Sequence, residues 1–444
     1  MIAVQRGLAA MPNLPNHSKL GLALNIQTIA IILAPAFALA AFAIAPAQAQ
    51  TLTVLHNFTG GADGAGPYAG LTIDAGGNLY GTAQFGGLEP CGNGGGGSGC
   101  GTVFRLAPRA DGWIFTPLYQ FAGGNDGAIP VGRVIFGPDG SLYGTTQRGG
   151  SQCDGYGCGT VFNMKLPPTV CKAAFCPWTE RVLHAFMGFT DGAYPLGELI
   201  FDQAGNIYGT TVEGGINDGG TAFELTPSGG GWAESLLVEF ENSGINPLSG
   251  LIFDQAGNLY GTTSGEAENG YGNVYQLMFT GSSWKERGLY NFQGADDGGR
   301  PAGGLIFDQS GNLYGTTAIA GSGGTGTVFE LTPSNGAWTF SLLYSFVGNF
   351  DGPRGSLFMD AAGNLYGTTI GAGTYSRGSV FKLTASGGGW IYTSLHDFTG
   401  GIDGGYPIGN VIFDASGNLY GTASSGGTGS ACYQGCGVAW EITP

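Results

Sequence analysis

The chain has 444 residues, of which 88 are glycine and 21 proline, and 31 acidic against 15 basic residues give it a net charge of −16. So acidic a chain excludes nucleic acid and anionic membranes as expected partners, because both need a basic contact surface. This glycine and proline content would indicate disorder in an aperiodic sequence, so the arrangement of the glycines decides the fold class.

Residues 1–49 have the pattern of an export signal. Arg6 and Lys19 precede an apolar run from about residue 29 to 44, and Ala47-Gln48-Ala49 follows it. A basic start, a short apolar core and an A-x-A exit are typical of a cleaved signal peptide. An uncleaved membrane anchor is the alternative, although the run is interrupted by Pro35 and short for a bilayer span. We therefore expect a secreted or periplasmic mature chain from about residue 50, without a membrane span.

The remaining sequence is built from repeats. A Tyr-Gly-Thr triplet recurs at spacings of 52 to 65 residues, which indicates an array of similar units. The triplets begin at Tyr80, Tyr143, Tyr208, Tyr260, Tyr314, Tyr366 and Tyr420. In the unit 301–346 we predict strands at 304–308, 313–317, 326–331 and 338–346, with a hairpin turn of the Asp/Gly/Asn type at 308–312.

Seven such units predict an all-β protein. Four short antiparallel strands cannot bury a core alone and must stack on neighbouring units. A seven-bladed β-propeller with four strands per blade, spanning residues 50–444, is the economical solution; a solenoid or a pair of sandwiches is the alternative. The segment 51–58 has a fourth-strand sequence, while 438–442 has that of a third strand. We therefore expect the N-terminal strand to complete the last blade and close the ring.

The repeat also carries a resemblance. The pattern G-L-I-F-D-x-x-G-N-L-Y-G-T-T, followed by G-T-V-F-E-L-T-P, resembles the tandem repeat of the exported "choice-of-anchor" GloVer-type bacterial proteins, across the whole mature chain. It is similar, more loosely, to the propeller repeats of NHL proteins and two-component-regulator sensors. The resemblance implies export and a repeat fold, and it implies no known activity.

The cysteines fall in close pairs within the mature chain. An even count in an exported protein favours local disulfides, here Cys91 with Cys100, Cys153 with Cys158, Cys171 with Cys176, and Cys432 with Cys436. Three pairs lie in long connections between second and third strands, at 83–100, 146–158 and 423–436, whereas the other four such connections have nine residues. Ring closure would place the three long loops in one contiguous sector, where function is expected.

Two aspartate series recur in the repeat. Asp202, Asp254, Asp308, Asp360 and Asp414 each precede x-x-Gly-Asn and are expected to hold the hairpin turn. Asp63, Asp126, Asp191, Asp297, Asp351 and Asp403 each precede a glycine in the link between units. We expect this second series to form a broken acidic ring close to the channel, either as plain turns or as a cation or polyhydroxyl site. Asp63, Asp126 and Asp403, below the long loops, are the candidate ligand or metal residues, and Ca²⁺ is the metal that would suit them.

No residue pattern names a reaction, and we assign no catalytic residue. His56, His184 and His396 occupy one repeat position around the ring and cannot meet at one centre. The favoured interpretation is a monomeric, exported, non-catalytic propeller that binds a glycan, a peptide or a cell-envelope ligand. The alternative is a metal-assisted hydrolase or lyase acting on a sugar, lactone or ester, and a purely structural repeat protein is the third reading. No cofactor is firmly implied.

Overall fold

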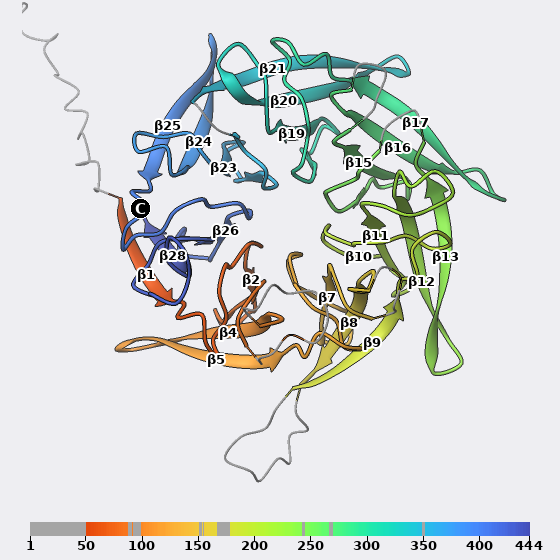
Figure 1. The fold of residues 1–444 in the computed structure, drawn as a ribbon. Coiled ribbons are helices and arrows are strands. Elements are labelled where there is room, and N and C mark those ends of the chain that lie inside the picture. The colour runs from red at the N-terminus through yellow and green to blue at the C-terminus, as the bar shows by residue number, and fades with distance from the viewer. Residues whose placement is uncertain are drawn as a thin grey trace, which may run out of the picture. The chain divides into compact units, whose positions relative to one another are not determined.

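The computed structural model describes residues 50–444 apart from 88–90, 92–98, 151–152, 154, 167–177, 242–244, 266–269 and 349–350. The predicted export signal at 1–49 lies outside the described residues. In the described part, seven four-stranded antiparallel sheets surround a central axis, which confirms the seven-bladed propeller (Figure 1). We find no helix there with the length and apolar character needed to cross a membrane.

The two inner strands of each blade are short and regular. The innermost strands are β2 (Thr72–Ile73), β6 (Ile135–Phe136), β10 (Ile200–Phe201), β14 (Ile252–Phe253), β18 (Ile306–Phe307), β22 (Phe358–Met359) and β26 (Ile412–Phe413). The second strands, which carry the Tyr-Gly-Thr triplet, are β3 (Leu79–Ala83), β7 (Leu142–Thr146), β11 (Ile207–Thr211), β15 (Leu259–Thr263), β19 (Leu313–Thr317), β23 (Leu365–Thr369) and β27 (Leu419–Ala423).

The two outer strands are longer. The third strands are β4 (Thr102–Arg109), β8 (Thr160–Lys165), β12 (Thr221–Ser228), β16 (Asn273–Phe279), β20 (Gly324–Ser334), β24 (Ser379–Ser386) and β28 (Val438–Thr443). The outermost are β5 (Gly112–Gln120), β9 (Thr179–Ala185), β13 (Gly231–Glu239), β17 (Trp284–Asn291), β21 (Ala337–Val347), β25 (Gly389–Asp397) and β1 (Thr51–Asn57).

The fifth unit tests the predicted strands directly. The second strand matches its prediction of 313–317, and the third and fourth are each somewhat longer than expected. The first strand has two residues rather than the five predicted at 304–308. The reason lies at both ends: the Gly304 amide donates to the Ser356 hydroxyl of the next unit, and Asp308 already belongs to the turn.

The ring is closed by the two ends of the propeller, as expected. Strand β1 pairs antiparallel with β28, from Thr51 opposite Thr443 to Asn57 opposite Val438, and the sheet has the order β1-β28-β27-β26. Across the same junction, the Thr422 hydroxyl donates to the Ala69 carbonyl of the first unit at 2.7 Å. The outer edge of β28 is therefore paired within the ring and is not left open to another chain.

Each member of the Tyr-Gly-Thr triplet has a packing role. The Tyr80 ring is buried and meets Phe136 of the next blade edge-on, with 5.2 Å between ring centroids. A Cβ at Gly81 would lie 2.6 Å from the Phe104 ring, so only glycine leaves room for that ring. The Thr82 hydroxyl donates to the Gly132 carbonyl of the next blade at 3.2 Å. The triplet thus joins each blade to the next and fixes the segment that faces the axis.

The first aspartate series holds the turns, as predicted. Asp308 accepts hydrogen bonds from the Ser310 and Asn312 amides and the Asn312 side chain. The same geometry occurs at Asp202, Asp254, Asp360 and Asp414. Asp74, which fits the same sequence pattern, also belongs to this series. Each aspartate of the series also accepts from the Tyr-Gly-Thr tyrosine of its unit, as Asp74 does from the Tyr80 hydroxyl. Burial, followed by the charge of Asp74, raises the pKa of Tyr80 to about 12.

Candidate functional site

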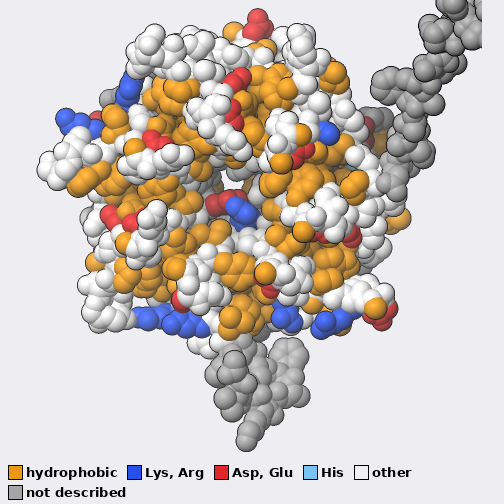
Figure 2. All heavy atoms as spheres, turned by 180° about the vertical axis from the view of Figure 1, so that it is seen from behind, with side chains coloured by type: hydrophobic (Ala, Val, Ile, Leu, Met, Phe, Trp, Pro, Cys, Tyr) orange, Lys and Arg blue, Asp and Glu red, His pale blue; other side chains and the backbone are white. Residues whose placement is uncertain are grey.

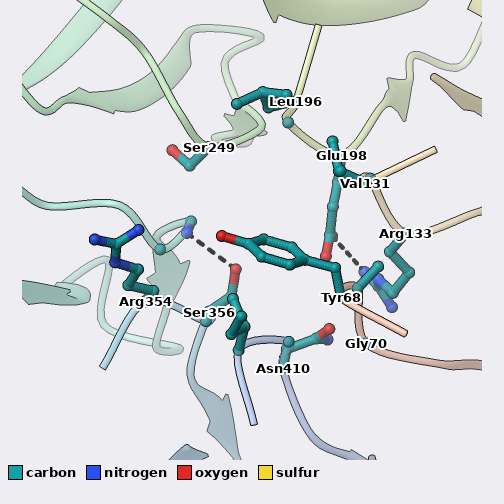
Figure 3. Close-up of a pocket in the computed structure, with 18 of the residues that line it drawn as sticks. Tyr68, Gly70, Val131, Arg133, Leu196, Glu198, Ser249, Arg354, Ser356 and Asn410 are labelled. Atoms are coloured by element: carbon teal, nitrogen blue, oxygen red, sulfur yellow. Dashed lines mark hydrogen bonds and ion pairs between the residues drawn. The ribbon is translucent and has the colours of Figure 1, made fainter. Parts of the chain in front are cut away.

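A cavity of about 290 Å³ lies on the propeller axis and is lined by residues from all seven units. Its wall consists mainly of the three residues between a proline and the apolar residue that precedes the innermost strand. These segments are 68–70, 131–133, 196–198, 248–250, 302–304, 354–356 and 408–410 (Figure 3). In five units a Tyr-Gly-Thr threonine holds the middle carbonyl of such a segment in the next unit. The scaffold therefore fixes the backbone of the wall.

The side chains of this wall differ from unit to unit, although the proline before them is constant. The residue after the proline is Tyr68, Val131, Leu196, Leu248, Ala302, Arg354 or Ile408. The third residue of the segment is Gly70, Arg133, Glu198, Gly250, Gly304, Ser356 or Asn410. Glycine occupies this third position in three units, so the fold does not require a large polar side chain there in every unit, although Ser356 joins two units by accepting the Gly304 amide.

An ion pair between units two and three is the main charged feature of the cavity. The Arg133 Nη2 donates to the Glu198 Oε2 at 2.7 Å, and the two side chains are 24% and 28% exposed. Burial lowers the pKa of Arg133, but attraction to the Glu198 carboxylate and the hydrogen bond to it outweigh this and raise the pKa. Arg133 is therefore a permanent cation, held in place by Glu198 at the wall of the cavity.

A second arginine enters the wall from unit six. The Arg354 guanidinium pairs with Asp351, three residues earlier in the link, and its side chain remains 35% exposed. Each of the two guanidiniums carries five N–H donors, and among the described residues each donates one hydrogen bond, to a carboxylate. Both arginines thus have donors left to offer to a molecule in the cavity.

The uncharged polar groups of the cavity include an aromatic ring. Tyr68 extends into the cavity, with Ser249 beyond its hydroxyl and Asn410 and Ser356 along one side (Figure 3). Gln84 and Gln147 also line the cavity and directly follow β3 and β7, at the start of the two long loops of units one and two. A small-molecule site usually combines aromatic rings, amides and hydroxyls on a concave wall with a small number of charged side chains.

The cavity belongs to the loop face of the propeller. In every unit the link before the innermost strand forms a β-bridge with the loop after the second strand, as Ala65 does with Phe85 and Gly405 with Ser425. The long loops and the links thus share one face, as the sequence predicted. The space-filling view from behind shows that the centre of the ring is hollowed on that side, with acidic and basic side-chain atoms visible inside (Figure 2).

The candidate aspartates lie elsewhere. Asp63 accepts from the Thr59 amide and contacts the His56 Nε2 of β1 at 3.0 Å. Asp126 likewise accepts from the Tyr119 hydroxyl, and Asp403 contacts the His396 Nε2 at 3.1 Å. Each carboxylate thus binds the outermost strand seven residues earlier, so the prediction of an acidic ring close to the channel is wrong in position. Asp351 alone in this series touches a described residue of the cavity wall, Arg354.

Local hydrogen bonds account for the chemistry of these carboxylates. Burial alone would raise the pKa of Asp63, but hydrogen bonds from His56 and Thr59 outweigh it and lower the pKa. Burial would likewise raise the pKa of Asp403, but hydrogen bonds from Thr399, the counterpart of Thr59, and from His396 outweigh it and lower the pKa. Among the described residues, no group of three or more His, Cys, Asp and Glu side chains is placed to hold a metal ion. Ligand binding by Asp63, Asp126 or Asp403 remains a prediction.

The disulfides are largely as expected. Cys91 bonds to Cys100, Cys153 to Cys158, and Cys432 to Cys436, one in each long loop. The fourth predicted pair, Cys171 with Cys176, lies outside the described residues. Two bridges enclose exposed tyrosines, Tyr156 and Tyr433, whose exposed fractions are 55% and 92%.

Sequence reasoning missed two features of this face. The pairing of the second aspartate series with His or Tyr was present as a pattern: the one link without Asp-Gly, at Asn246, follows the one outer strand that has an apolar residue, Val238, at the His/Tyr position. The cavity wall was also present, as two variable positions beside a constant proline, since side chains such as Arg133 and Glu198 interrupt an otherwise repeated motif.

The fold and the site define this protein as a seven-bladed β-propeller with a polar axial cavity. Within that class, the chain belongs to the Gloeobacter/Verrucomicrobia repeat family, whose model matches residues 40–200 and 197–435. The disulfides are consistent with an extracellular or periplasmic protein. A comparison with curated protein sequences finds no match.

Similar solved structures are distant in sequence. The extracellular domain of a candidate hybrid two-component system of B. thetaiotaomicron is 10% identical with a TM-score of 0.52, over 87% of this chain and 39% of that one. The periplasmic gluconolactonase of Pseudomonas aeruginosa is 16% identical with a TM-score of 0.49, over 78% and 96%. The PQQ-bound aldose sugar dehydrogenase of Streptomyces coelicolor is 12% identical with a TM-score of 0.40, over 89% and 98%. Identities this low bear on the fold alone.

Proposed function

We propose that the mature chain is an exported, monomeric, non-catalytic binding protein that takes up a glycan in its axial cavity. The observation that carries this proposal is the variation of the cavity wall between units whose scaffold is otherwise repeated. A purely structural propeller could have glycine as the third residue of all seven wall segments. This chain has glycine there in three units, at Gly70, Gly250 and Gly304. Selection for a specific ligand is the physical reason to replace glycine with Arg133, Glu198 or Asn410.

A glycan suits the chemistry of this wall. The ring of Tyr68 offers a flat apolar face for a sugar ring, while amides and hydroxyls such as Asn410 and Ser356 can exchange hydrogen bonds with sugar hydroxyls. The volume of about 290 Å³ is at the lower end of the range for small-molecule pockets. Export, proposed from the sequence of residues 1–49 and the disulfides, would bring the cavity into contact with envelope or environmental glycans.

The test is to fill the cavity without touching the scaffold strands. Ala302 lies in the wall and is partly exposed, so Ala302→Trp should occupy the space of the ligand. Mature wild type and variant are applied to an array of neutral and acidic oligosaccharides, with Ile391→Trp on the exposed outer face of β25 as the matched control. We expect binding by wild type and Ile391→Trp and at least tenfold weaker binding by Ala302→Trp.

Two results would overturn the proposal. Equal binding by Ala302→Trp and wild type would place recognition outside the cavity. Chemical turnover of a bound oligosaccharide, detected by mass spectrometry of the released sugar, would instead support the hydrolase or lyase alternative. Thermal unfolding of both variants checks that the substitutions leave the propeller folded.

A further inference from the structure

The axial cavity does not end at Arg354. A second hollow of about 370 Å³ is lined by residues of units four to six, and it shares Leu248, Ala302 and Arg354 with the axial cavity. Among its other lining residues are Asn246, Ser264 and Arg300. The two hollows therefore adjoin along one side, with Arg354 at their border. A single ligand that fills both must be longer than one sugar ring.

Charge distinguishes these hollows from the rest of the molecule. Their described lining residues include three arginines, Arg133, Arg300 and Arg354, and one carboxylate, that of Glu198, a formal charge of +2. Counting Asp351, which pairs with Arg354 from just outside the lining, the charge is still +1. The whole chain, by contrast, has a net charge of −16. A positive site within an acidic protein draws an anion to that site.

Arg300 is the cation best placed to meet a ligand. It is exposed, and no salt bridge to it is found among the described residues. Its backbone is held in the left-handed region, with φ of 53°, by hydrogen bonds of its amide to the Tyr271 carbonyl and of its carbonyl to the Ala318 amide. Its Cα is thus fixed at the rim of the second hollow, while its guanidinium is available for bidentate contact with an anionic group.

We propose that the ligand is an acidic oligosaccharide, with carboxylate or sulfate groups on its sugars, that spans both hollows. This inference rests on the proposed function. One anionic group meets Arg354 at the border and a second meets Arg300, while a sugar ring lies against Tyr68 in the axial cavity. Arg133, already paired with Glu198 at 2.7 Å, offers its remaining donors to sugar hydroxyls.

An acidic peptide fits the described surface less well. Peptides bind by adding a strand to a sheet edge, by placing apolar side chains in pockets, or, when acidic, by pairing with clustered arginines. The innermost strands have two residues each and offer no edge of useful length. The wall of the second hollow consists largely of small or polar residues such as Asn246, Ser264 and Gly265. Hydroxyl groups spread along an anionic chain match that wall better.

The experiment is calorimetric titration of the mature chain with three probes of similar length. These are trigalacturonate, a sulfated carrageenan tetrasaccharide and neutral cellotriose. We expect one or both acidic probes to bind at least tenfold more tightly than cellotriose. Arg300→Gln and Arg354→Lys should each weaken that binding by at least fivefold, whereas Arg109→Gln, at the exposed end of β4, should leave it unchanged. Added salt should weaken it further in the wild type than in Arg300→Gln.

The outcomes separate this inference from the proposed function. If cellotriose binds as tightly as both acidic probes and Ala302→Trp abolishes that binding, the cavity binds glycans and the charge argument fails. If no oligosaccharide binds in the titration or on the array, both proposals fail. Tighter binding of a poly-glutamate decamer than of either acidic sugar would also overturn the inference. Because Arg300 is exposed and outside every strand, its variant should remain folded, and thermal unfolding checks this.

Discussion

Units one and five of the propeller share a scaffold but present different surfaces to the axis. In both, the Tyr-Gly-Thr tyrosine donates to the turn aspartate, Tyr80 to Asp74 at 3.0 Å and Tyr314 to Asp308 at 3.3 Å. Toward the axis and the loop face, unit one places Tyr68, Gln84 and a disulfide-closed loop, where unit five has Ala302, Ala318 and a loop of nine residues.

This difference separates two kinds of constraint. Positions that join blade to blade are nearly invariant among the units, because each blade must bury the same surfaces of its neighbours. Positions at the axis and in the loops after the second strands vary, because the scaffold fixes their backbone without fixing their side chains. If this division is correct, equivalent scaffold changes in the two units should cost the same stability, and changes at the axis should alter binding with little effect on stability.

Removing the closing strand should produce the largest effect, because it breaks the ring that holds both units. A chain that begins at residue 59 lacks β1, and this exposes Trp440 and Ile442 of β28, which are now buried. Full burial of each large apolar side chain stabilises by about 1.5–3 kcal/mol, so we expect a loss of several kcal/mol and aggregation through the open edge. Thermal unfolding and size-exclusion chromatography measure this.

The matched control for that deletion is rescue in trans. A synthetic peptide of residues 50–58 should restore much of the melting temperature, since it can pair with β28 in the same register. An unchanged melting temperature in the deleted chain would contradict the closed ring.

A pair of glycine substitutions sharpens the comparison of the two units. A Cβ at Gly81 would lie 2.6 Å from the Phe104 ring and 2.8 Å from Leu71. A Cβ at Gly315 would lie 2.5 Å from the Phe329 ring and 2.9 Å from Leu305. Overpacking of this kind typically costs about 1–3 kcal/mol, so Gly81→Ala and Gly315→Ala should lower the urea midpoint to the same extent.

Gly288→Ala is the control for this pair, because a Cβ there meets no atom within 4 Å. It should leave the midpoint unchanged or slightly raised, since alanine restricts the unfolded chain. A difference of more than about 1 kcal/mol between Gly81→Ala and Gly315→Ala, beyond ordinary context effects, would mean that the two units do not share one scaffold.

The same division explains what could be read from the sequence. The blade number, the Tyr-Gly-Thr strands and the turn aspartates were predictable because each is set by local chemistry that recurs in most or all units, and the ring closure was predictable because segment 51–58 has a fourth-strand sequence. The innermost strands were overestimated in length, because the Gly304 amide leaves the ladder for the Ser356 hydroxyl of the next unit. That contact joins two units, and the pattern of one unit does not contain it.

The candidate site was expected on the loop face, but the aspartates named for it do not line the axial cavity. The Asp-Gly series attracted attention because carboxylates are chemically suggestive, yet Asp63 and Asp403 are bound by His56 and His396 on the outermost strands. The cavity wall was overlooked because Arg133 and Glu198 stand 65 residues apart and meet only when units two and three pack. Variation between repeats at a fixed position was the available signal, and it needs the fold to be interpreted.

The smallest predicted effect concerns a carboxyl group on the outermost strand β9, at a position where some other units have an aromatic residue. Phe115 of unit one stacks on His56 with 4.1 Å between centroids, and Phe340 of unit five stacks on Tyr290 at 4.6 Å. Units two, three and four instead have a glutamate at this position, which is Glu180, Glu234 and Glu286. Burial, followed by the nearby charge of Asp126, raises the pKa of Glu180 from 4.5 to about 7.

The sign of the resulting pH dependence follows from the two pKa values. Between pH 4.5 and 7 the unfolded chain releases the Glu180 proton while the folded chain keeps it, so stability falls as pH rises and the full penalty is present above pH 7. Glu180→Gln removes the charge and should stabilise the propeller at pH 8 by about 1 kcal/mol after allowance for solvent screening. Near pH 4 it should have little effect.

Asp111→Asn, on the exposed turn before β5, is the control and should change little at either pH. Thermal unfolding of the three chains from pH 4 to pH 8 measures this, and a stability difference independent of pH would show that Glu180 is not a strained buried acid.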